Sequence, residues 1–316
     1  MPRFERALVT GGAGFLGSHL CEQLSSAGTV VYCLDNLSTG DHANVAHLQR
    51  DRGFAFVAHD VTEPIPDLGP IDVVFHLASP ASPVDYLSLP IETMSAGAYG
   101  TRNALDFAAR TNARFVLAST SEVYGDPLEH PQRETYWGNV NPVGSRSVYD
   151  EAKRYGEALC SAYERQNSCD TAIARIFNTY GPRMRDDDGR MIPTFIDQAL
   201  RGSPITVAGT GKQTRSLCYV DDTVAGLRAL AESDETGPIN IGNPGELSVR
   251  SVAERIRTIT DSRCDIIEVA PAADDPQRRC PDITRARSLL DWSPVVDVDT
   301  GLRRTIEWVR ERPHAA

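Results

Sequence analysis

Ala7-Leu8-Val9-Thr10-Gly11-Gly12-Ala13-Gly14-Phe15-Leu16-Gly17 is the segment from which the fold of this chain is best inferred. Its first four residues are typical of a buried strand, and glycines at 11, 14 and 17 then run into a helix expected to begin near Phe15. Without a Cβ, such a turn lets backbone N–H groups approach phosphate oxygens, and the helix N-terminus adds about half a positive charge. The segment predicts a pyrophosphate site, with a simple tight turn as the alternative.

Alternating elements extend this unit through the first half of the chain. Short β-branched runs occur at Ala7–Thr10, Val30–Leu34, Ala55–Val57, Val73–Leu77, Phe115–Ala118 and Ala172–Ile176, mostly separated by stretches of helical period. In one of these stretches Pro90 is placed to open a helix. The pattern predicts an α/β fold with a doubly wound parallel sheet of Rossmann type.

Beyond Asn178 the elements become shorter and predict a smaller α/β C-terminal lobe for the substrate. Helices are expected near Ile192–Leu200, Thr223–Ala231, Val249–Ile259, Ile283–Leu290 and Gly301–Arg310, and a strand at Ile205–Val207. No tandem repeat or low-complexity linker separates the two parts, so we expect a shared interface with a cleft.

Composition narrows the class of protein. The 316 residues carry 43 acidic and 32 basic side chains, a formal charge of -11, which disfavours nucleic acid and anionic bilayers as partners. No apolar run suits a secretory signal or approaches the ~18 residues of a membrane span, so we expect a cytoplasmic protein with no membrane partner. The seven cysteines lack paired CxxC spacing, which predicts reduced thiols and no metal site.

The second expected strand indicates that the pyrophosphate belongs to a dinucleotide, and which one. It ends at Asp35, whose carboxylate can accept hydrogen bonds from both adenosine ribose hydroxyls and would repel a ribose phosphate, so NAD is expected rather than NADP. His76, at the end of the fourth strand, is expected to be packed rather than catalytic. The cofactor-binding residues predicted in this way are Gly11, Gly14, Phe15, Leu16, Gly17, Asp35, Asn36, Ser38, Thr39, Gly40, Asp60, Val61, Leu77, Ala78 and Ser79, together with Tyr149 and Lys153.

These assignments divide the chain. Residues 1–177 are expected to form the NAD-binding Rossmann domain, with segments at about 215–240 packing back onto it. Residues 178–316 are expected to form mainly the substrate-binding lobe.

Tyr149 and Lys153 lie four residues apart, hence on one face of a helix. A phenol with a pKa of ~10 is a poor base at neutral pH, but a neighbouring ammonium favours the phenolate. The strand Phe115–Ala118 runs into Ser119-Thr120-Ser121-Glu122 at the edge where such sheets bind ligands, and Thr120 or Ser119 can donate a hydrogen bond to the substrate oxygen. With the glycine turn, these residues resemble the extended, sugar-nucleotide-modifying branch of the short-chain dehydrogenase/reductase superfamily.

Enzymes of that branch begin by oxidising a sugar 4-hydroxyl, and the neighbouring side chains decide the fate of the resulting ketone. A 4,6-dehydratase has Thr-Asp-Glu where this chain has Thr120-Ser121-Glu122, and serine is a poor acid for the leaving hydroxyl. A 4-epimerase generally lacks the glutamate. Both enzyme classes remain alternatives to a third, a decarboxylase, in which the 4-ketone allows a C5 carboxylate to leave as CO2.

Longer motifs favour the UDP-glucuronate decarboxylase family. The resemblance covers roughly residues 6 to 310 and is carried by residues 77–83, 119–127, 136–142, 174–184 and 274–279. It implies NAD-dependent conversion of UDP-glucuronate to UDP-xylose through C4 oxidation, loss of CO2 and re-reduction by the same bound NADH. Release of the 4-keto pentose, or a non-enzymatic NAD-sensing or scaffolding role, remains open.

The same resemblance implies roles for individual residues. Arg279, with Arg278 as the alternative, would bind the sugar carboxylate, and Glu122 would be the active-site glutamate. The implied catalytic residues are Thr120, Glu122, Tyr149, Lys153 and Arg279, and the implied substrate-binding residues are Tyr86, Ser121, Arg146, Asn178, Thr206, Lys212, Gln213 and Arg215. Gly97 stands where many members have asparagine. The resemblance also implies a homodimer formed by the helices around Thr93–Arg110 and Tyr149–Gln166.

Overall fold

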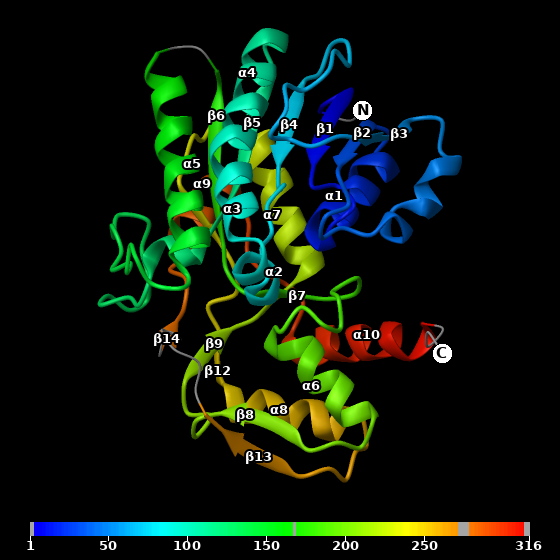
Figure 1. The fold of residues 1–316 in the computed structure, drawn as a ribbon, viewed down its shortest axis with the longest axis vertical. Helices are drawn as coiled ribbons and strands as arrows, with labels where there is room; N and C mark the ends of the chain where they lie inside the picture. The colour runs from blue at the N-terminus through cyan, green and yellow to red at the C-terminus, as the bar shows by residue number, and fades with distance from the viewer. Residues whose placement is uncertain (1–2, 167–168, 271–277, 313–316) are drawn as a thin grey trace.

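The computed structural model describes residues 3–166, 169–270 and 278–312 (Figure 1). Its centre is a seven-stranded sheet in the order β11-β6-β5-β4-β1-β2-β3, in which each pair is parallel. The strands are β1 (Arg6–Thr10), β2 (Val30–Asp35), β3 (Phe54–Ala58), β4 (Val73–His76), β5 (Arg114–Thr120), β6 (Thr171–Ile176) and β11 (Ile239–Ile241). All six strands predicted for this half are present, and the predicted α/β, Rossmann-type sheet is confirmed.

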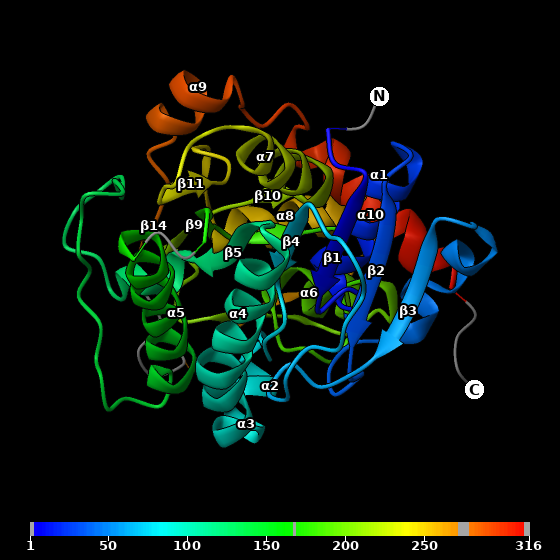
Figure 2. The same ribbon diagram turned by 90° about the horizontal axis from the view of Figure 1, so that it is seen from above.

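Helices cover both faces of the sheet (Figure 2), because successive side chains of each strand point to opposite sides. In β1, Ala7 and Val9 join the core cluster under α1 (Phe15–Ser26) and α7 (Val220–Glu232), whereas Leu8 joins the cluster under α4 (Thr101–Thr111) and α5 (Ser147–Arg165).

The helix that Pro90 was expected to open is divided in the structure. It begins as α3 (Pro90–Ser95), passes through a π-helical turn at Ala96–Gly100 and continues as α4. The shorter α2 (Pro83–Ser88) precedes it. Short 3-10 helices occur at His42–Asn44, Ala46–Arg50 and Ser121–Tyr124.

The smaller lobe lies below the sheet in Figure 1. It contains α6 (Met191–Leu200), α8 (Val249–Ile259) and the parallel pair β8 (Ile205–Ala208) and β13 (Ile266–Val269). In a second small sheet, β9 (Thr214–Ser216) lies between β12 (Glu246–Ser248) and β14 (Arg278–Arg279), with Arg279 beside Arg215 in register. The predicted helices near 192–200 and 249–259 and the strand at 205–207 are confirmed within a residue.

Later segments return to the large domain. Strand β11 pairs with β6, α7 lies against the main sheet, and α9 (Thr284–Leu290) packs on α7 and β11. Trp292 then donates its Nε1 hydrogen to the carbonyl of Asp222 at 3.1 Å. The chain ends in α10 (Val298–Glu311), and β7 (Thr179–Tyr180) pairs with β10 (Cys218–Tyr219) between the two parts. The boundary at residue 177 stays a prediction.

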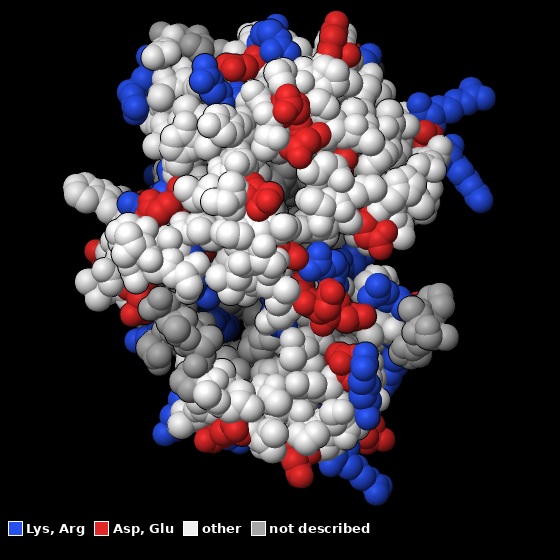
Figure 3. All heavy atoms as spheres, in the orientation of Figure 1, with Lys and Arg blue, Asp and Glu red and all other residues white. Residues whose placement is uncertain are grey.

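No helix within the described ranges combines the length and apolar character that crossing a bilayer requires. Acidic and basic side chains are interspersed over the face seen in Figure 3. All seven cysteines are free thiols.

Candidate active site

A cavity of about 1000 Å³ lies between the large domain and the lobe, at the carboxyl ends of the main-sheet strands. This edge is where open α/β sheets bind their ligands. Every cofactor-binding and catalytic residue predicted from the sequence lines it. So do the predicted substrate-binding residues Tyr86, Ser121, Arg146, Asn178, Thr206, Gln213 and Arg215. Lys212 is exposed and lies outside the lining.

The glycine turn leaves room for a phosphate. Gly11 has φ +69°, and a Cβ there would lie 2.8 Å from the backbone nitrogen of Ala78. Gly14 is the N-cap of α1, and because it has no side chain, the first-turn N–H groups of this helix are uncapped and face the cavity. Their partial positive charge suits a diphosphate.

Asp35 is held at the end of β2 by two backbone donors. Its Oδ2 accepts from the N–H of Ala13 at 2.9 Å and its Oδ1 from the N–H of Leu37 at 2.8 Å. Burial raises the pKa of this carboxyl above its usual value, although both N–H groups act in the opposite direction. A Cβ on Gly40 would lie 3.0 Å from Asp35 Oδ1, so the glycine keeps space open beside the carboxylate. These residues fit the ribose and diphosphate of a dinucleotide.

His76 has a structural role, as expected. Its Nδ1 lies 2.8 Å from Thr10 Oγ1 and its Nε2 lies 3.2 Å from Thr101 Oγ1. Burial, with a contribution from the charge of Lys153, lowers its pKa to about 3. The imidazole is therefore neutral and ties β1 and β4 to α4.

Tyr149 and Lys153 come from the start of α5, whose first turns face the cavity. Lys153 Nζ donates to the carbonyl of Ala118 at 2.8 Å and lies 5.8 Å from the centre of the Tyr149 ring. Thr120 is among the neighbours that act to lower the pKa of the Tyr149 phenol, whereas the hydroxyl of Ser119 donates to Glu157 at 2.6 Å. Of the two candidate donors, the structure therefore places Thr120 beside Tyr149.

Burial dominates the electrostatics of this pair. Burial raises the pKa of the Tyr149 phenol above its usual value, and the largest opposing charge is that of Arg190 rather than Lys153. Burial also lowers the pKa of the Lys153 ammonium to about 8. Burial thus disfavours the charged forms of both groups, and the amine is bonded to a backbone carbonyl rather than to the phenol. That Lys153 favours the phenolate stays a prediction.

Glu122, in the 3-10 helix directly after β5, lies between two guanidinium groups. Arg146 Nη2 donates to Glu122 Oε2 at 2.7 Å, and Arg279 Nη1 donates to Glu122 Oε1. Burial alone would raise the pKa of this carboxyl, but the charges of Arg279 and Arg146 outweigh it and lower the pKa to about 2. Glu122 is therefore ionised at neutral pH.

Arg279 is buried, whereas Arg278 is mostly exposed and faces Glu246. Arg279 Nη2 also donates to the carbonyl of Gly125 at 3.1 Å. Its Nε has no hydrogen-bond partner among the described residues and remains a buried donor. Of the two arginines, the geometry places Arg279 in the cavity. Residues 274–277, the start of the motif that contains them, lie outside the described residues.

Tyr86, from α2, stacks on the phenol ring of Tyr149. The two rings are 5.2 Å apart between centres and 10° from parallel. Burial raises the pKa of Tyr86 to about 12, so it remains a neutral hydroxyl. Tyr86 thus packs flat against the Tyr149 ring and restricts its movement.

On the lobe side of the cavity, polar side chains are held by neighbours of β8 and β9. Gln198 donates to Thr206 Oγ1 at 2.8 Å, and Gln213 donates to the carbonyl of Ala208 at 2.8 Å. Arg215 Nη1 donates to the carbonyl of Thr214 at 2.8 Å. Both small sheets of the lobe therefore present polar groups to the same space.

Comparison with known proteins identifies the relatives of this arrangement. The profile of the NAD dependent epimerase/dehydratase family matches residues 7–242. The chain belongs to this family. NAD is therefore the cofactor, as the glycine turn and Asp35 predicted.

Similar curated proteins include UDP-glucuronic acid decarboxylases. UDP-glucuronic acid decarboxylase 1 of Arabidopsis thaliana is 50% identical over 97% of this chain and 70% of its own length. UDP-glucuronic acid decarboxylase 1 of Xenopus tropicalis is 49% identical over 97% of this chain and 72% of its own.

Solved structures of two epimerases share the fold. A UDP-glucose 4-epimerase from Thermotoga maritima aligns with a TM-score of 0.90 at 28% identity, covering 97% of this chain and 99% of its own. A UDP-glucuronic acid 4-epimerase from Bacillus cereus, in complex with UDP-glucuronic acid and NAD, aligns with a TM-score of 0.85 at 28% identity over the same shares.

Three arginines that line the cavity were not predicted from the sequence. Arg185 bridges the two parts, donating to the carbonyl of Thr39 at 3.1 Å and to Asp85 at 2.7 Å. Arg183 donates to Glu22 at 2.5 Å, and Arg190 donates to the carbonyl of Ala81 at 2.8 Å. Arg183 lies within the motif at 174–184, so the sequence pointed to its position. The motif alone indicates no role for it.

Gly97 lies in the π-helical turn against α5. A Cβ at this position would lie 2.6 Å from the Cβ of Ala152, which directly precedes Lys153. The glycine is therefore required by the close approach of the two helices at Ala152.

Proposed function

We propose that this chain decarboxylates UDP-glucuronate to UDP-xylose and CO2, consuming no external reductant. The observation that carries the proposal is the buried guanidinium of Arg279, which reaches the same cavity as Tyr149 and holds Glu122. Its relatives at about 50% identity, which are named UDP-glucuronic acid decarboxylases, support it.

The first step is oxidation at C4 of the sugar. Tyr149 takes the proton of the 4-hydroxyl, and Thr120 donates a hydrogen bond to the reacting oxygen. NAD, held by the glycine turn and Asp35, would supply the oxidant for this step and the reductant for the last one, and its oxidised form would add positive charge to the site. Lys153 adds a second positive charge, and its pKa of about 8 keeps it mostly protonated at neutral pH. Both charges oppose the effect of burial on Tyr149.

The second step uses the resulting ketone. The C5 carboxylate is now a β-keto acid, so its C5–carboxyl bond breaks and the electron pair moves into the enolate. Arg279 is proposed to orient the carboxylate through the charge of its guanidinium, which lines the cavity. Glu122 is proposed to repel the bound carboxylate and so to favour departure of the neutral gas. A proton then returns to C5 and the ketone is reduced.

The remaining substrate contacts are proposals of the same kind. Tyr86, Ser121 and Arg146 would contact the sugar and its acid group. Asn178, Thr206, Gln213 and Arg215 would hold the diphosphate and uridine, with Lys212 reaching in from the surface. The domain boundary at residue 177 is proposed on the same basis.

We also propose a homodimer in the cytoplasm. Apolar side chains are exposed along α3, the π-turn and α5, with 72% of Ile91, 63% of Tyr99 and 48% of Tyr155 accessible. Helices with such faces are stabilised by pairing with a second copy.

The seven free thiols are consistent with a reducing compartment.

The direct test incubates purified protein with UDP-glucuronate and a catalytic amount of NAD, and follows CO2 and nucleotide sugars by mass. The expected products are UDP-xylose and CO2. Conversion to UDP-galacturonate without gas would indicate a 4-epimerase. Accumulation of the 4-keto pentose with NADH would indicate an oxidative decarboxylase.

A variant tests the proposed base. Tyr149→Phe should still bind NAD but should form no 4-keto sugar.

A further inference from the structure

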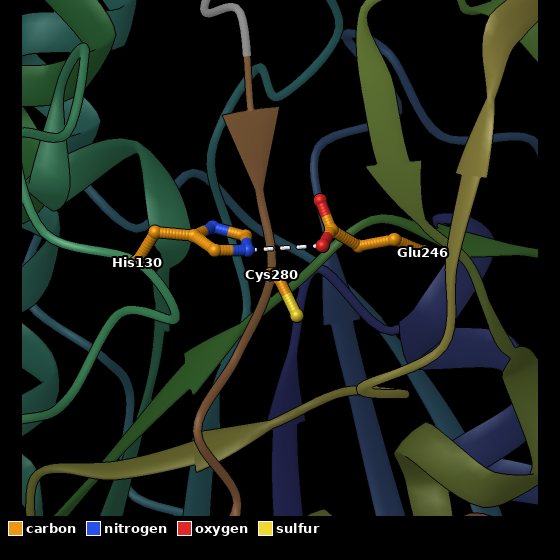
Figure 4. Close-up of side chains that lie close together, drawn as sticks. All are labelled: His130, Glu246 and Cys280. Carbon is orange, nitrogen blue, oxygen red and sulfur yellow. Dashed lines mark ion pairs between the residues drawn. The ribbon is translucent and has the colours of Figure 1, made fainter.

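Three side chains with metal-binding atoms meet outside the cavity, on its β14 side. His130 comes from the loop between β5 and α5, Glu246 from β12, and Cys280 directly follows β14. The imidazole Nε2 lies 2.9 Å from a carboxylate oxygen of Glu246, and the three ligand atoms all lie within 4.8 Å of one another. Figure 4 shows the imidazole and carboxylate pointing toward each other from opposite sides, with the thiol at the strand between them.

We propose that His130, Glu246 and Cys280 form a site for a thiophilic divalent cation, best suited to Zn²⁺. Imidazole nitrogen, carboxylate oxygen and thiolate sulfur are the ligand types that Zn²⁺ prefers, and a three-ligand site leaves one position for water. On binding, Cys280 loses its thiol proton to solvent and forms the metal–sulfur bond. The thiolate and the carboxylate then balance the two charges of the cation.

The surrounding hydrogen bonds hold these ligands in place. Gln132 Oε1 accepts from the N–H of Cys280 at 2.8 Å, and the N–H of Gln132 donates to the carbonyl of Cys280 at 2.8 Å. Thr214 donates to the second carboxylate oxygen of Glu246 at 2.6 Å. Contacts of this kind orient metal ligands and increase affinity.

Two contacts compete with the cation. The thiol of Cys280 donates to the carbonyl of Pro244 at 3.3 Å, and Arg278 Nη2 lies 3.8 Å from the same Glu246 oxygen that faces His130. Arg278 is 58% exposed at its side chain, so it can turn toward solvent. Removal of Arg278 is therefore expected to strengthen metal binding.

The site has a structural consequence for the proposed reaction. Cys280 follows Arg279, whose guanidinium holds Glu122 in the cavity. A cation at the site would join three segments that are distant in sequence and fix the strand end that carries Arg279. This inference does not depend on which reaction the cavity performs.

The test titrates the full-length, chelator-treated protein with Co²⁺ and records its absorption spectrum. One equivalent is expected to produce a near-ultraviolet thiolate-to-cobalt band with tetrahedral ligand-field bands, all removed by Zn²⁺. Cys280→Ser should lose the thiolate band, His130→Ala should weaken binding by at least about tenfold, and Arg278→Ala should strengthen it. Cys280 is buried, so Cys280→Ser could fail to fold. His130 lies in a loop, and His130→Ala therefore tests the site without that risk.

The matched control is His47→Ala, which removes an exposed imidazole 3.4 Å from Glu22 with no cysteine in the group. Its Co²⁺ spectrum should equal that of the original protein. The proposal is overturned if no stoichiometric Co²⁺ binds, if Cys280→Ser keeps the thiolate band, or if only His47→Ala loses the bound cation.

Discussion

Glu122→Gln should destabilise the protein by an amount that depends strongly on pH. Glutamine keeps the shape of the side chain but removes the charge that Arg146 and Arg279 hold. Lowering the pKa of Glu122 from 4.5 to about 2 means that the folded state favours the carboxylate over the neutral acid. At about 1.4 kcal/mol for each tenfold change in acidity, this preference corresponds to ~3 kcal/mol.

The pH window follows from the two pKa values. A depressed pKa stabilises the folded state fully above the unfolded value of 4.5, and the effect is lost as the pH falls toward about 2. Original protein and Glu122→Gln should therefore differ by ~3 kcal/mol at about pH 7, and progressively less below about pH 4.5. The difference is large because the variant leaves the buried Arg279 without its anion.

Urea unfolding from about pH 7 to about pH 3, followed by circular dichroism, measures this difference. The control is Glu151→Gln, whose partner Arg154 lies 3.6 Å away on the helix surface. An exposed pair of this kind is expected to contribute less than about 1 kcal/mol. A Glu122→Gln penalty that is absent at neutral pH, or unchanged in acid, would refute the reasoning.

Three further variants test other parts of the structure. Gly97→Ala should lower the free energy of unfolding, measured in urea, by about 1–3 kcal/mol because the added methyl group would lie 2.6 Å from the Cβ of Ala152. Adding Ala152→Gly should restore most of this stability. If it does not, the helix contact is not the cause. Asp35→Ala should weaken NAD binding by roughly tenfold or more in calorimetry and improve binding of NADP, because a buried charged acceptor is lost; equal preference before and after the change would contradict its proposed role. Tyr99→Arg should make the protein monomeric by analytical ultracentrifugation, since it places charge in the proposed apolar interface, and a dimer that persists would place the interface elsewhere.

The large domain could be predicted from the sequence because its signals are local. Apolar runs of strand length define β1 to β6, and each is followed at its carboxyl end by small or polar residues that line the cavity. Parallel strands bring those ends to one edge, so predicting the strands also gathered the candidate site residues. Strand β11 was missed because three residues give too short a pattern.

Properties set by tertiary contacts could not be predicted. The raised pKa of Tyr149 comes mainly from burial, which the spacing of Tyr149 and Lys153 does not reveal. Arg190 reaches the site from a loop with no periodicity, and His130, Glu246 and Cys280 meet only when the chain is folded. The choice between Ser119 and Thr120 depends on which face of β5 each hydroxyl occupies at the strand end, where the alternation is least certain.

The pairing of β14 with β9 bears on which substrates the proposed enzyme could accept. Arg279, assigned to the acid group, and Arg215, assigned to the nucleotide, are cross-strand neighbours whose backbone separation is fixed by a hydrogen-bond ladder at about 4.8 Å. Loops can adjust to ligands of different reach, whereas adjacent strands in register cannot. We therefore expect a uronic acid lengthened by one carbon, or joined to uridine through a single phosphate, to bind less well, because the backbone positions that carry the two guanidinium groups cannot move apart.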